Sequence, residues 1–325
     1  MHTLSRRTLA GLLLGAAAAP SAARAQANFP TRSLRMIAPY APGGGVDTSA
    51  RLLAMPMGAA MGQTVIVENR PGAGGSIGAA EVARAAPDGY TVLLDALGHV
   101  LNPVLQKNLP FDYSTAFTPI TQLLIWPQIF LCSPRLPVRT LPEFIAYAKS
   151  KPGELSYGSS GNATAAHLAA SLLFSRAEVT LEHVPYRGGT PALQDLLAGN
   201  VACLFGTVAS SLQFAKEGTL RPLAVTTTSR LAALPNVPTV AEQGFPGFEL
   251  NEWNGLYAPA GLPVALRDRW YNLAKAALAD SNVAARLEGL GAIPVGSEPA
   301  AFAAFVVEQR TKMQALVTQT GIEIG

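Results

Sequence analysis

The sequence contains only two cysteines, Cys132 and Cys203, and four histidines among 325 residues. No pair of these residues has the short spacing that binds zinc, so we expect no metal site. Both cysteines lie in apolar, strand-like runs. An oxidising compartment would permit a disulfide between them, but isolated cysteines are also common as small buried residues. The sequence leaves both possibilities open.

Charge is also scarce, because Asp, Glu, Lys and Arg make up 14% of the chain. The formal net charge of +3 comes entirely from Arg6, Arg7 and Arg24, since the first 25 residues hold no acid. The rest of the chain is neutral and has no dense run of Lys or Arg. Nucleic-acid binding depends on such runs, so we expect that this protein does not bind nucleic acid.

No apolar run after the N-terminus is long enough for a membrane span. At the N-terminus, Arg6 and Arg7 precede a short apolar stretch over residues 9–19, and Ala23-Arg24-Ala25 fits a signal-peptidase site. We therefore predict that residues 1–25 are a signal peptide, cleaved before Gln26, and that the protein is periplasmic. Paired arginines fit both Sec and twin-arginine export.

The motifs of several enzyme classes are missing. A nucleophile elbow needs G-x-S-x-G, and residues 158–161 are one residue too short for it. The glycine-rich segment 72–78 has Ile77 where a dinucleotide-binding loop needs its last glycine. We predict no catalytic residues and no cofactor. The alternative is a hydrolase that pairs Ser159 or Ser160 with His167.

Short apolar strands alternate with helical stretches along the chain, which predicts an α/β fold with mostly parallel sheets. The mature chain is long enough for two lobes. The segments 117–127 and 248–259 are typical of crossings between lobes. We therefore predict that residues 26–123 and 250–325 form lobe 1 and residues 124–249 form lobe 2, with a ligand cleft between them.

The first candidate binding loop follows the predicted strand 34–38 and precedes a helix predicted over 47–61. Helix N-termini carry unpaired backbone N–H groups and a partial positive charge, which suit a carboxylate. Glycines let a ligand approach those groups closely; a tight turn that binds nothing is the alternative. The candidate ligand-binding residues here are Tyr40, Pro42, Gly43, Gly44, Gly45 and Asp47.

A second loop repeats this design in the predicted lobe 2, between the strand 155–158 and the helix 163–175. Two helix starts that face each other across a cleft would hold a dicarboxylate, or one carboxylate and a polar tail. Helix capping by Ser160 or Thr164 is the alternative. The candidate residues of this loop are Ser159, Ser160, Gly161, Asn162, Thr164 and His167.

Several short motifs, in a shared order and spacing, resemble the extracytoplasmic solute receptors of tripartite tricarboxylate transporters, the Bug or TctC family. The motifs lie at residues 40–51, 67–78, 87–90, 109–120, 183–186, 191–199, 223–226 and 234–239.

The resemblance implies a type II periplasmic-binding-protein fold with two hinge crossings. It also implies cleft closure around a small organic acid or amino-acid-like solute, delivered to membrane permease subunits by a monomeric receptor. A receptor that signals to a sensor protein is the alternative. Within the family pattern, the segment 67–78 is structural, and Asp47 is expected to brace its helix by pairing with Arg51.

Two stretches depart from the family pattern. Asp95 stands where small, often hydroxylic residues face the cleft. Ala202 stands where an Asp is common, and beyond it Gly206-Thr207 replaces a frequent Asp-Asn pair near the cleft. An acidic group at Asp95 would repel a solute anion, or accept a proton from an ammonium or hydroxyl group of the solute. His99 either offsets this charge or is an exposed loop residue. We include Asp95 and Thr207 among the candidate ligand-binding residues.

Overall fold

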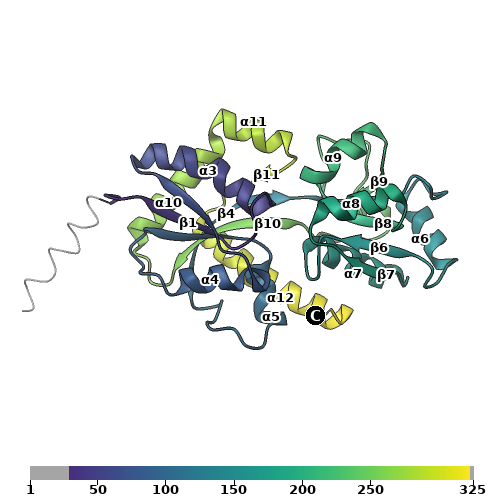
Figure 1. The fold of residues 1–325 in the computed structure, drawn as a ribbon, viewed down its shortest axis with the longest axis horizontal. Coiled ribbons are helices and arrows are strands. Elements are labelled where there is room, and N and C mark those ends of the chain that lie inside the picture. The colour runs from purple at the N-terminus through teal and green to yellow at the C-terminus, as the bar shows by residue number, and fades with distance from the viewer. Residues whose placement is uncertain (1–28, 323–325) are drawn as a thin grey trace, which may run out of the picture.

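The computed structural model describes residues 29–322, so the predicted signal peptide lies outside the described range. Figure 1 shows two lobes side by side, with strands running between them. One lobe is built on a six-stranded sheet of order β11-β4-β10-β3-β1-β2, and the other on a five-stranded sheet of order β7-β6-β8-β5-β9. The predicted two-lobed α/β fold is confirmed.

The first sheet and its helices come from both ends of the described chain. Its strands are β1 (Leu34–Ala38), β2 (Val65–Asn69), β3 (Thr91–Asp95), β4 (Phe117–Trp126), β10 (Glu252–Pro259) and β11 (Ile293–Pro294). Its helices are α3 (Gly45–Met61), the short η1 (Ala73–Gly75), α4 (Ser76–Ala83), α5 (Gly98–Leu105), α10 (Val264–Ala279), α11 (Ser281–Gly289) and α12 (Pro299–Thr320).

The second sheet comes from the middle of the chain. Its strands are β5 (Gln128–Cys132), β6 (Ser156–Ser159), β7 (Glu182–Pro185), β8 (Cys203–Thr207) and β9 (Arg221–Val225). Its helices are α6 (Leu141–Lys149), α7 (Ala165–Ala177), α8 (Gly189–Ala198), α9 (Val208–Glu217) and η2 (Ala241–Gln243). Apolar periodicity in the sequence predicts helices over 141–149, 189–198, 208–217 and 299–320, and the bounds of α6, α8, α9 and α12 agree.

The prediction of mostly parallel sheets was wrong. Among the strands described, parallel strand pairs are confined to the β-α-β units, β1 with β2 and β3, and β6 with β7 and β8. The segments predicted as crossings are the long strands β4 and β10, which pair antiparallel with each other. The chain enters the second sheet at β5 directly after β4, and β5 also pairs antiparallel with both neighbours. Strands that carry the chain out of one lobe and back must run in opposite directions, which makes both sheets mixed.

Helix α5 was not predicted. It contains Gly98 at its first position and Pro103 in its last turn, two residues that weaken a helical pattern. Tertiary contact compensates, because His99 of α5 stacks on Tyr257 of β10 with ring centroids 3.8 Å apart. His99 is 1% exposed. Of the two possibilities for His99, the exposed loop residue is therefore wrong.

The C-terminal helix α12 connects the two lobes. Phe302 is fully buried against Trp253 and Tyr257 of β10. Near the other end of the helix, the Gln319 side chain donates a hydrogen bond to Ser175 of α7. Figure 1 shows α12, in yellow, running beneath the first lobe toward the second. Its apolar face therefore covers the region where the chain crosses between lobes.

The contact between α12 and β10 depends on Gly255. A Cβ atom at this position would lie 2.3 Å from the Phe302 ring and 3.0 Å from Tyr257. We expect Gly255→Ala to lower the free energy of unfolding by about 1–3 kcal/mol, because the added methyl group would overpack the core. Urea denaturation measures this change. Gly289→Ala is the matched control, since its Cβ would meet open space on a helix; it should leave stability unchanged or raise it. Equal stability of both variants would contradict this packing.

Candidate functional site

The start of α3 lies at the carboxyl end of β1, and its backbone donors are open. Pro42, Gly43, Gly44 and Gly45 are exposed. Gly44 is the N-cap residue, and no side chain caps the helix. The N–H groups of the first turn are therefore available to a ligand anion. In Figure 1 the purple N-terminal end of α3 faces the second lobe.

Asp47 shapes this loop from within. Its carboxylate accepts hydrogen bonds from the Gly43 N–H at 2.9 Å and from the side chains of Arg51 and Asn69. Burial opposes ionisation of Asp47, but these three partners hold its pKa below the usual value. The predicted pairing of Asp47 with Arg51 is confirmed, with the two charged groups 2.9 Å apart. Asp47 fixes the turn and leaves the donors of the next residues free.

Tyr40 is held in a cage made largely of backbone. A Cβ at Gly75 would lie 3.1 Å from the Tyr40 ring, and one at Gly98 would lie 2.4 Å from its hydroxyl oxygen. Both positions therefore require glycine. The Tyr40 hydroxyl donates to Asp95 at 3.2 Å. The glycine-rich segment 72–78 thus supports the binding loop as structure.

Asp95 is enclosed by the protein. It is 1% exposed, and its oxygens accept from Tyr40, from the Ala96 N–H at 2.8 Å, and from His99 Nδ1 at 3.1 Å. Burial lowers the pKa of His99 although Asp95 opposes that shift, which favours the neutral imidazole at neutral pH.

Glu252, at the start of β10, was not predicted. One of its carboxylate oxygens accepts from the N–H groups of Leu97 and Trp253, at 3.0 and 3.1 Å. Burial raises its pKa to about 7. Together with Asp95, it occupies the backbone donors that precede α5. A lone acid before an apolar strand carries no sequence signal for this role, because the contact joins residues far apart in the chain.

The second predicted loop lies between β6 and α7. Thr164 is the N-cap of α7; its hydroxyl accepts from the His167 N–H and donates to the Gly161 carbonyl. The capping alternative is therefore realised at Thr164. Ser160 is half-buried and Asn162 is exposed, so they lie on the open side of the loop.

Beneath this loop, Ser159 and two histidines form a compact group. The Ser159 hydroxyl lies 2.7 Å from His183 Nε2, and His183 stacks on His167 with ring centroids 3.9 Å apart. His167 Nδ1 accepts from the Ala163 N–H at 3.1 Å. No carboxylate bonds either ring in the described chain, so the group lacks the orienting acid of a serine hydrolase. It supports the loop from below.

Thr207 is the last residue of β8 and lies at the same end of the second sheet as the loop after β6. Its hydroxyl lies 2.9 Å from that of Ser210 in α9. Directly opposite on β5 is Gln128, which is 1% exposed and whose Oε1 has no hydrogen-bond partner in the described residues. Sequence reasoning missed Gln128, because its position beside Thr207 follows only from the antiparallel register.

Asn254 ties the first loop to both crossing strands. Its side-chain oxygen accepts from Trp126 of β4 at 2.8 Å and from Ser49 of α3 at 2.7 Å. Ser49 also bonds the Gly45 carbonyl at 2.7 Å. Asn254 is fully buried. The start of α3 is thereby linked to the strands on which the lobes would move.

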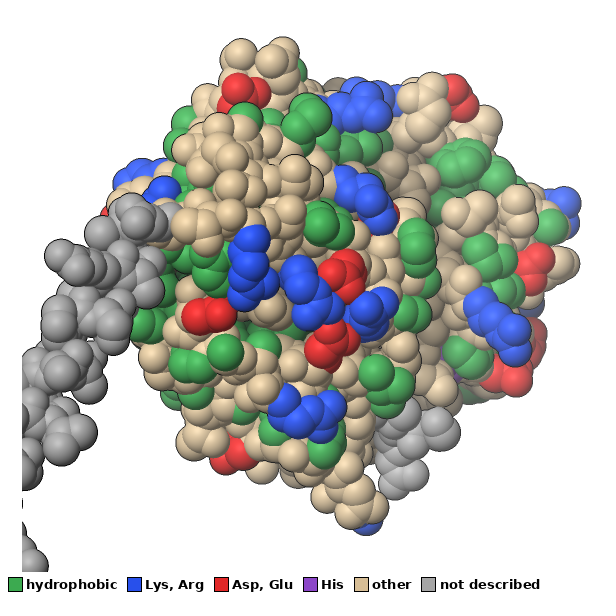
Figure 2. Space-filling model, turned by 60° about the vertical axis from the view of Figure 1, so that its left-hand side comes forward, with side chains coloured by type: hydrophobic (Ala, Val, Ile, Leu, Met, Phe, Trp, Pro, Cys, Tyr) green, Lys and Arg blue, Asp and Glu red, His purple; other side chains and the backbone are tan. Residues whose placement is uncertain are grey.

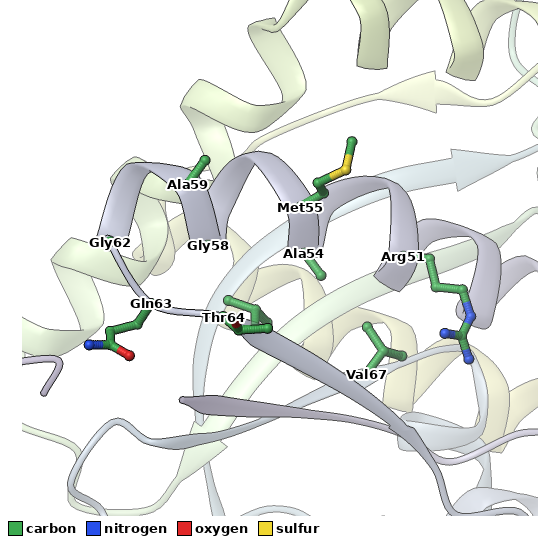
Figure 3. Close-up of a pocket in the computed structure, with 10 residues that line it drawn as sticks. Arg51, Ala54, Met55, Gly58, Ala59, Gly62, Gln63, Thr64 and Val67 are labelled. Carbon is green, nitrogen blue, oxygen red and sulfur yellow. The ribbon is translucent and has the colours of Figure 1, made fainter. Parts of the chain in front are cut away.

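Another hollow lies on the first lobe between α3 and β2 (Figure 3). Small and apolar residues line much of it, including Ala54, Met55 and Gly58. It contains none of the predicted site residues and has no convergent polar groups, so we assign it no role. Figure 2 shows basic and acidic side chains intermixed on the face it displays.

Over residues 29–322, no cluster of three or more His, Cys, Asp or Glu side chains is arranged to hold a metal ion. Within the same range, none of the helices combines the length and the apolar character needed to cross a membrane.

The comparison with known families agrees with this arrangement. The family profile "Tripartite tricarboxylate transporter family receptor" matches residues 49–322. The chain belongs to this family. Its members are solute-binding receptors rather than enzymes, and the solved member BugD is described as a periplasmic binding protein. The family predicted from the sequence is therefore confirmed.

Three solved structures illustrate the similarity. BugD is 35% identical, covers 91% of this chain and 99% of its own, and superposes with a TM-score of 0.79. The R. palustris protein Rpa4515, solved with adipate, is 32% identical over 91% of this chain and 99% of its own, with a TM-score of 0.82. MatC from Rhodopseudomonas palustris, with bound malate, is 32% identical over 89% and 100%, with a TM-score of 0.78.

The histidine group makes this receptor's stability depend on pH. Burial and the neighbouring His183 lower the pKa of His167 from 6.5 to about 4. Between these values the unfolded chain binds the proton more strongly, so stability falls as pH falls. Asn at this position keeps an acceptor near Ala163 but does not titrate. We expect His167→Asn to reduce the stability lost between these pH values by up to about 3 kcal/mol.

Urea denaturation of both proteins at the two pH values tests this expectation. His183→Asn is the control for the second ring, whose pKa is also lowered by burial. An identical pH dependence in wild type and His167→Asn would show that His167 is not held neutral.

Proposed function

We propose that this receptor works in the periplasm, where it captures a small carboxylated solute between the start of α3 and the loop before α7. The single observation that carries the proposal is the uncapped N-terminus of α3, which has exposed glycines and faces the second lobe. Adipate and malate in two relatives support a carboxylate as the ligand class.

The proposed contacts use both lobes. In the first, backbone N–H groups of residues 44–47 bind a carboxylate, while the Gly43 N–H stays bonded to Asp47. Tyr40 and Pro42 bound the space beside it. In the second, Ser160 and Asn162, on the open side of the loop, supply backbone and side-chain donors. The donors of Gly161 and Thr164 are used within the loop and shape it, and Ser159 and His167 hold it in place. Thr207 and Gln128 complete the edge. Because α5 already has Asp95 and Glu252 at its start, it offers little to a solute anion.

Cleft closure is the proposed working motion. The lobes would rotate about Pro127 and Asn251, where the chain passes between the two sheets. These points lie close to the lobe boundaries predicted at 123/124 and 249/250. Ligand donors contributed by both lobes favour closure, since each lobe supplies part of the binding free energy. The closed receptor would then dock, as a monomer, on the permease subunits of a tripartite tricarboxylate transporter.

A receptor that signals to a sensor protein would use the same closure, so it remains the second candidate. Ser159 and His183 are in contact, but the missing orienting acid makes a hydrolase the less favoured function. We propose no catalysis and no cofactor.

The binding site is tested by Gly44→Asp. Gly44 has ordinary extended dihedral angles, and a Cβ there would meet only the Ala41 carbonyl at 3.7 Å. An Asp at this N-cap position would accept hydrogen bonds from the first-turn N–H groups, which the solute otherwise uses. We expect stability to be kept or raised by a few tenths of a kcal/mol, and solute binding to be lost.

The measurement is a thermal-shift panel of organic acids and amino acids on refolded protein, free of carried-over ligand. A solute at about 100 times its dissociation constant adds roughly 2.7 kcal/mol to wild type. Gly289→Asp, where a Cβ would meet open space on a helical backbone away from the proposed site, is the charge-matched control. Full affinity in Gly44→Asp would remove the α3 start from the site.

The same panel tests the charge of Asp95. Asp95→Asn keeps a side chain of the same size but removes the carboxylate beside Tyr40. If this charge repels solute anions, we expect dicarboxylates to bind the variant several-fold more tightly. If it attracts an ammonium group, amino acids should lose affinity instead. An unchanged ligand profile would show that Asp95 has a structural role only.

A further inference from the structure

The two cysteines of the chain lie directly opposite each other in the second sheet. Cys132 of β5 pairs with Cys203 of β8 in the antiparallel register. Backbone hydrogen bonds join the two strands just beyond each end of this paired segment. At one end the Ser133 N–H donates to the Ala202 carbonyl, and at the other the Val208 N–H donates to the Pro127 carbonyl. Both bonds join residues that face each other in the same register.

Hydrogen-bonded and non-hydrogen-bonded pairs alternate along an antiparallel ladder. Since Ser133 and Ala202 form a hydrogen-bonded pair, Cys132 and Cys203 form a non-hydrogen-bonded one. In such pairs the Cα atoms are about 4.5 Å apart and the side chains are at their closest. This separation lies within the range of about 4.4–6.8 Å that a disulfide spans.

The two thiols also point to the same side of the sheet. Cys132 and Cys203 pack in one hydrophobic cluster with Phe130 and Phe205, whereas Leu131 and Leu204 pack in another. Both cysteines are 0% exposed. Two sulfur atoms are thus held side by side in the core between the sheet and α7.

We propose that Cys132 and Cys203 form a disulfide that links β5 to β8 in the exported protein. The inference rests on the periplasmic location given under the proposed function, because an oxidising compartment forms and keeps such bonds. It does not depend on which solute the receptor binds.

The bond forms while the chain is still unfolded. In the native fold, burial raises the pKa of Cys132 to about 11 and that of Cys203 well above its ordinary value, so neither gives a thiolate for exchange. In the unfolded chain, one thiolate attacks the disulfide of an oxidant and forms a mixed disulfide. The second cysteine thiolate then attacks the mixed disulfide, forms the bond between the two cysteines and releases the oxidant's remaining sulfur as a thiol. The two thiols lose two protons and two electrons, and the oxidant leaves as two thiols.

The bond encloses residues 133–202, which include α6, β6, α7 and the proposed binding loop 159–164. Closing so long a segment removes much of the conformational freedom of the unfolded chain. Oxidation therefore stabilises the second lobe and keeps β5 and β8 in register.

The direct test uses the full chain, exported by a bacterial host and purified from its periplasm. The protein is unfolded in urea with iodoacetamide and no reductant, and its intact mass is measured. We expect no alkylation without reductant, and alkylation of both cysteines after reduction with a phosphine. Alkylation of both cysteines without reduction would overturn the proposal.

A second test asks whether the disulfide also forms outside the periplasm, and whether it forms only while the chain folds. Reduced protein is unfolded and refolded with oxidised glutathione, and the same reagent is added to folded, reduced protein. We expect the disulfide only after refolding, because the folded thiols are buried. Glutathione adducts on refolded protein in place of the bond would show that the two sulfur atoms do not meet.

Variants provide the controls. In Cys132→Ala and in Cys203→Ala, the remaining cysteine should be alkylated without reduction. Reductant should lower the melting temperature of wild type by several degrees but leave that of the double variant unchanged. An equal response of both proteins would mean that the bond is absent. Ligand binding is measured separately. Failure of the wild type to bind any solute would contradict the proposed function but not the disulfide.

Discussion

The side-chain oxygen of Asn254 accepts hydrogen bonds from Trp126 and from Ser49, and these bonds fix the start of α3 against both crossing strands. All three residues are buried, so loss of Asn254 would leave the Trp126 indole N–H without a partner in the core, while Ser49 would keep the Gly45 carbonyl. The open donors of α3 therefore have a defined position relative to the point where the chain passes between the lobes. In the proposed function, this one side chain would link ligand contact to lobe movement.

Two helix starts in the first lobe differ in whether their backbone N–H donors are free. The donors at the start of α3 are free because no side chain caps Gly44, while the backbone donors before α5 are taken by Asp95 and Glu252. In the proposed site, a solute anion therefore binds at α3 rather than at α5, whose backbone donors are occupied by the protein's own carboxyl groups.

In the second lobe, support comes from beneath the loop. The Ser159–His183 contact and the stacked histidines hold residues 159–164 from below, and the paired strands β5 and β8 lie beside them. The register that brings Cys132 opposite Cys203 also places Gln128 opposite Thr207 at the edge of the sheet. One strand pairing therefore decides both the position of a site residue and the meeting of the two thiols.

The sequence by itself determined the fold class, the family, most helix bounds and the two loops, because apolar periodicity and glycine-rich turns are local signals. It also predicted the Asp47–Arg51 pair, whose residues are one helical turn apart. The antiparallel course of β4 and β10, helix α5, the enclosure of Asp95, and the roles of Glu252, Gln128 and Asn254 were decided only by the tertiary structure. Each of these depends on contacts between residues distant in the chain, and no local pattern records which strands will lie side by side or which buried donor will meet which acceptor.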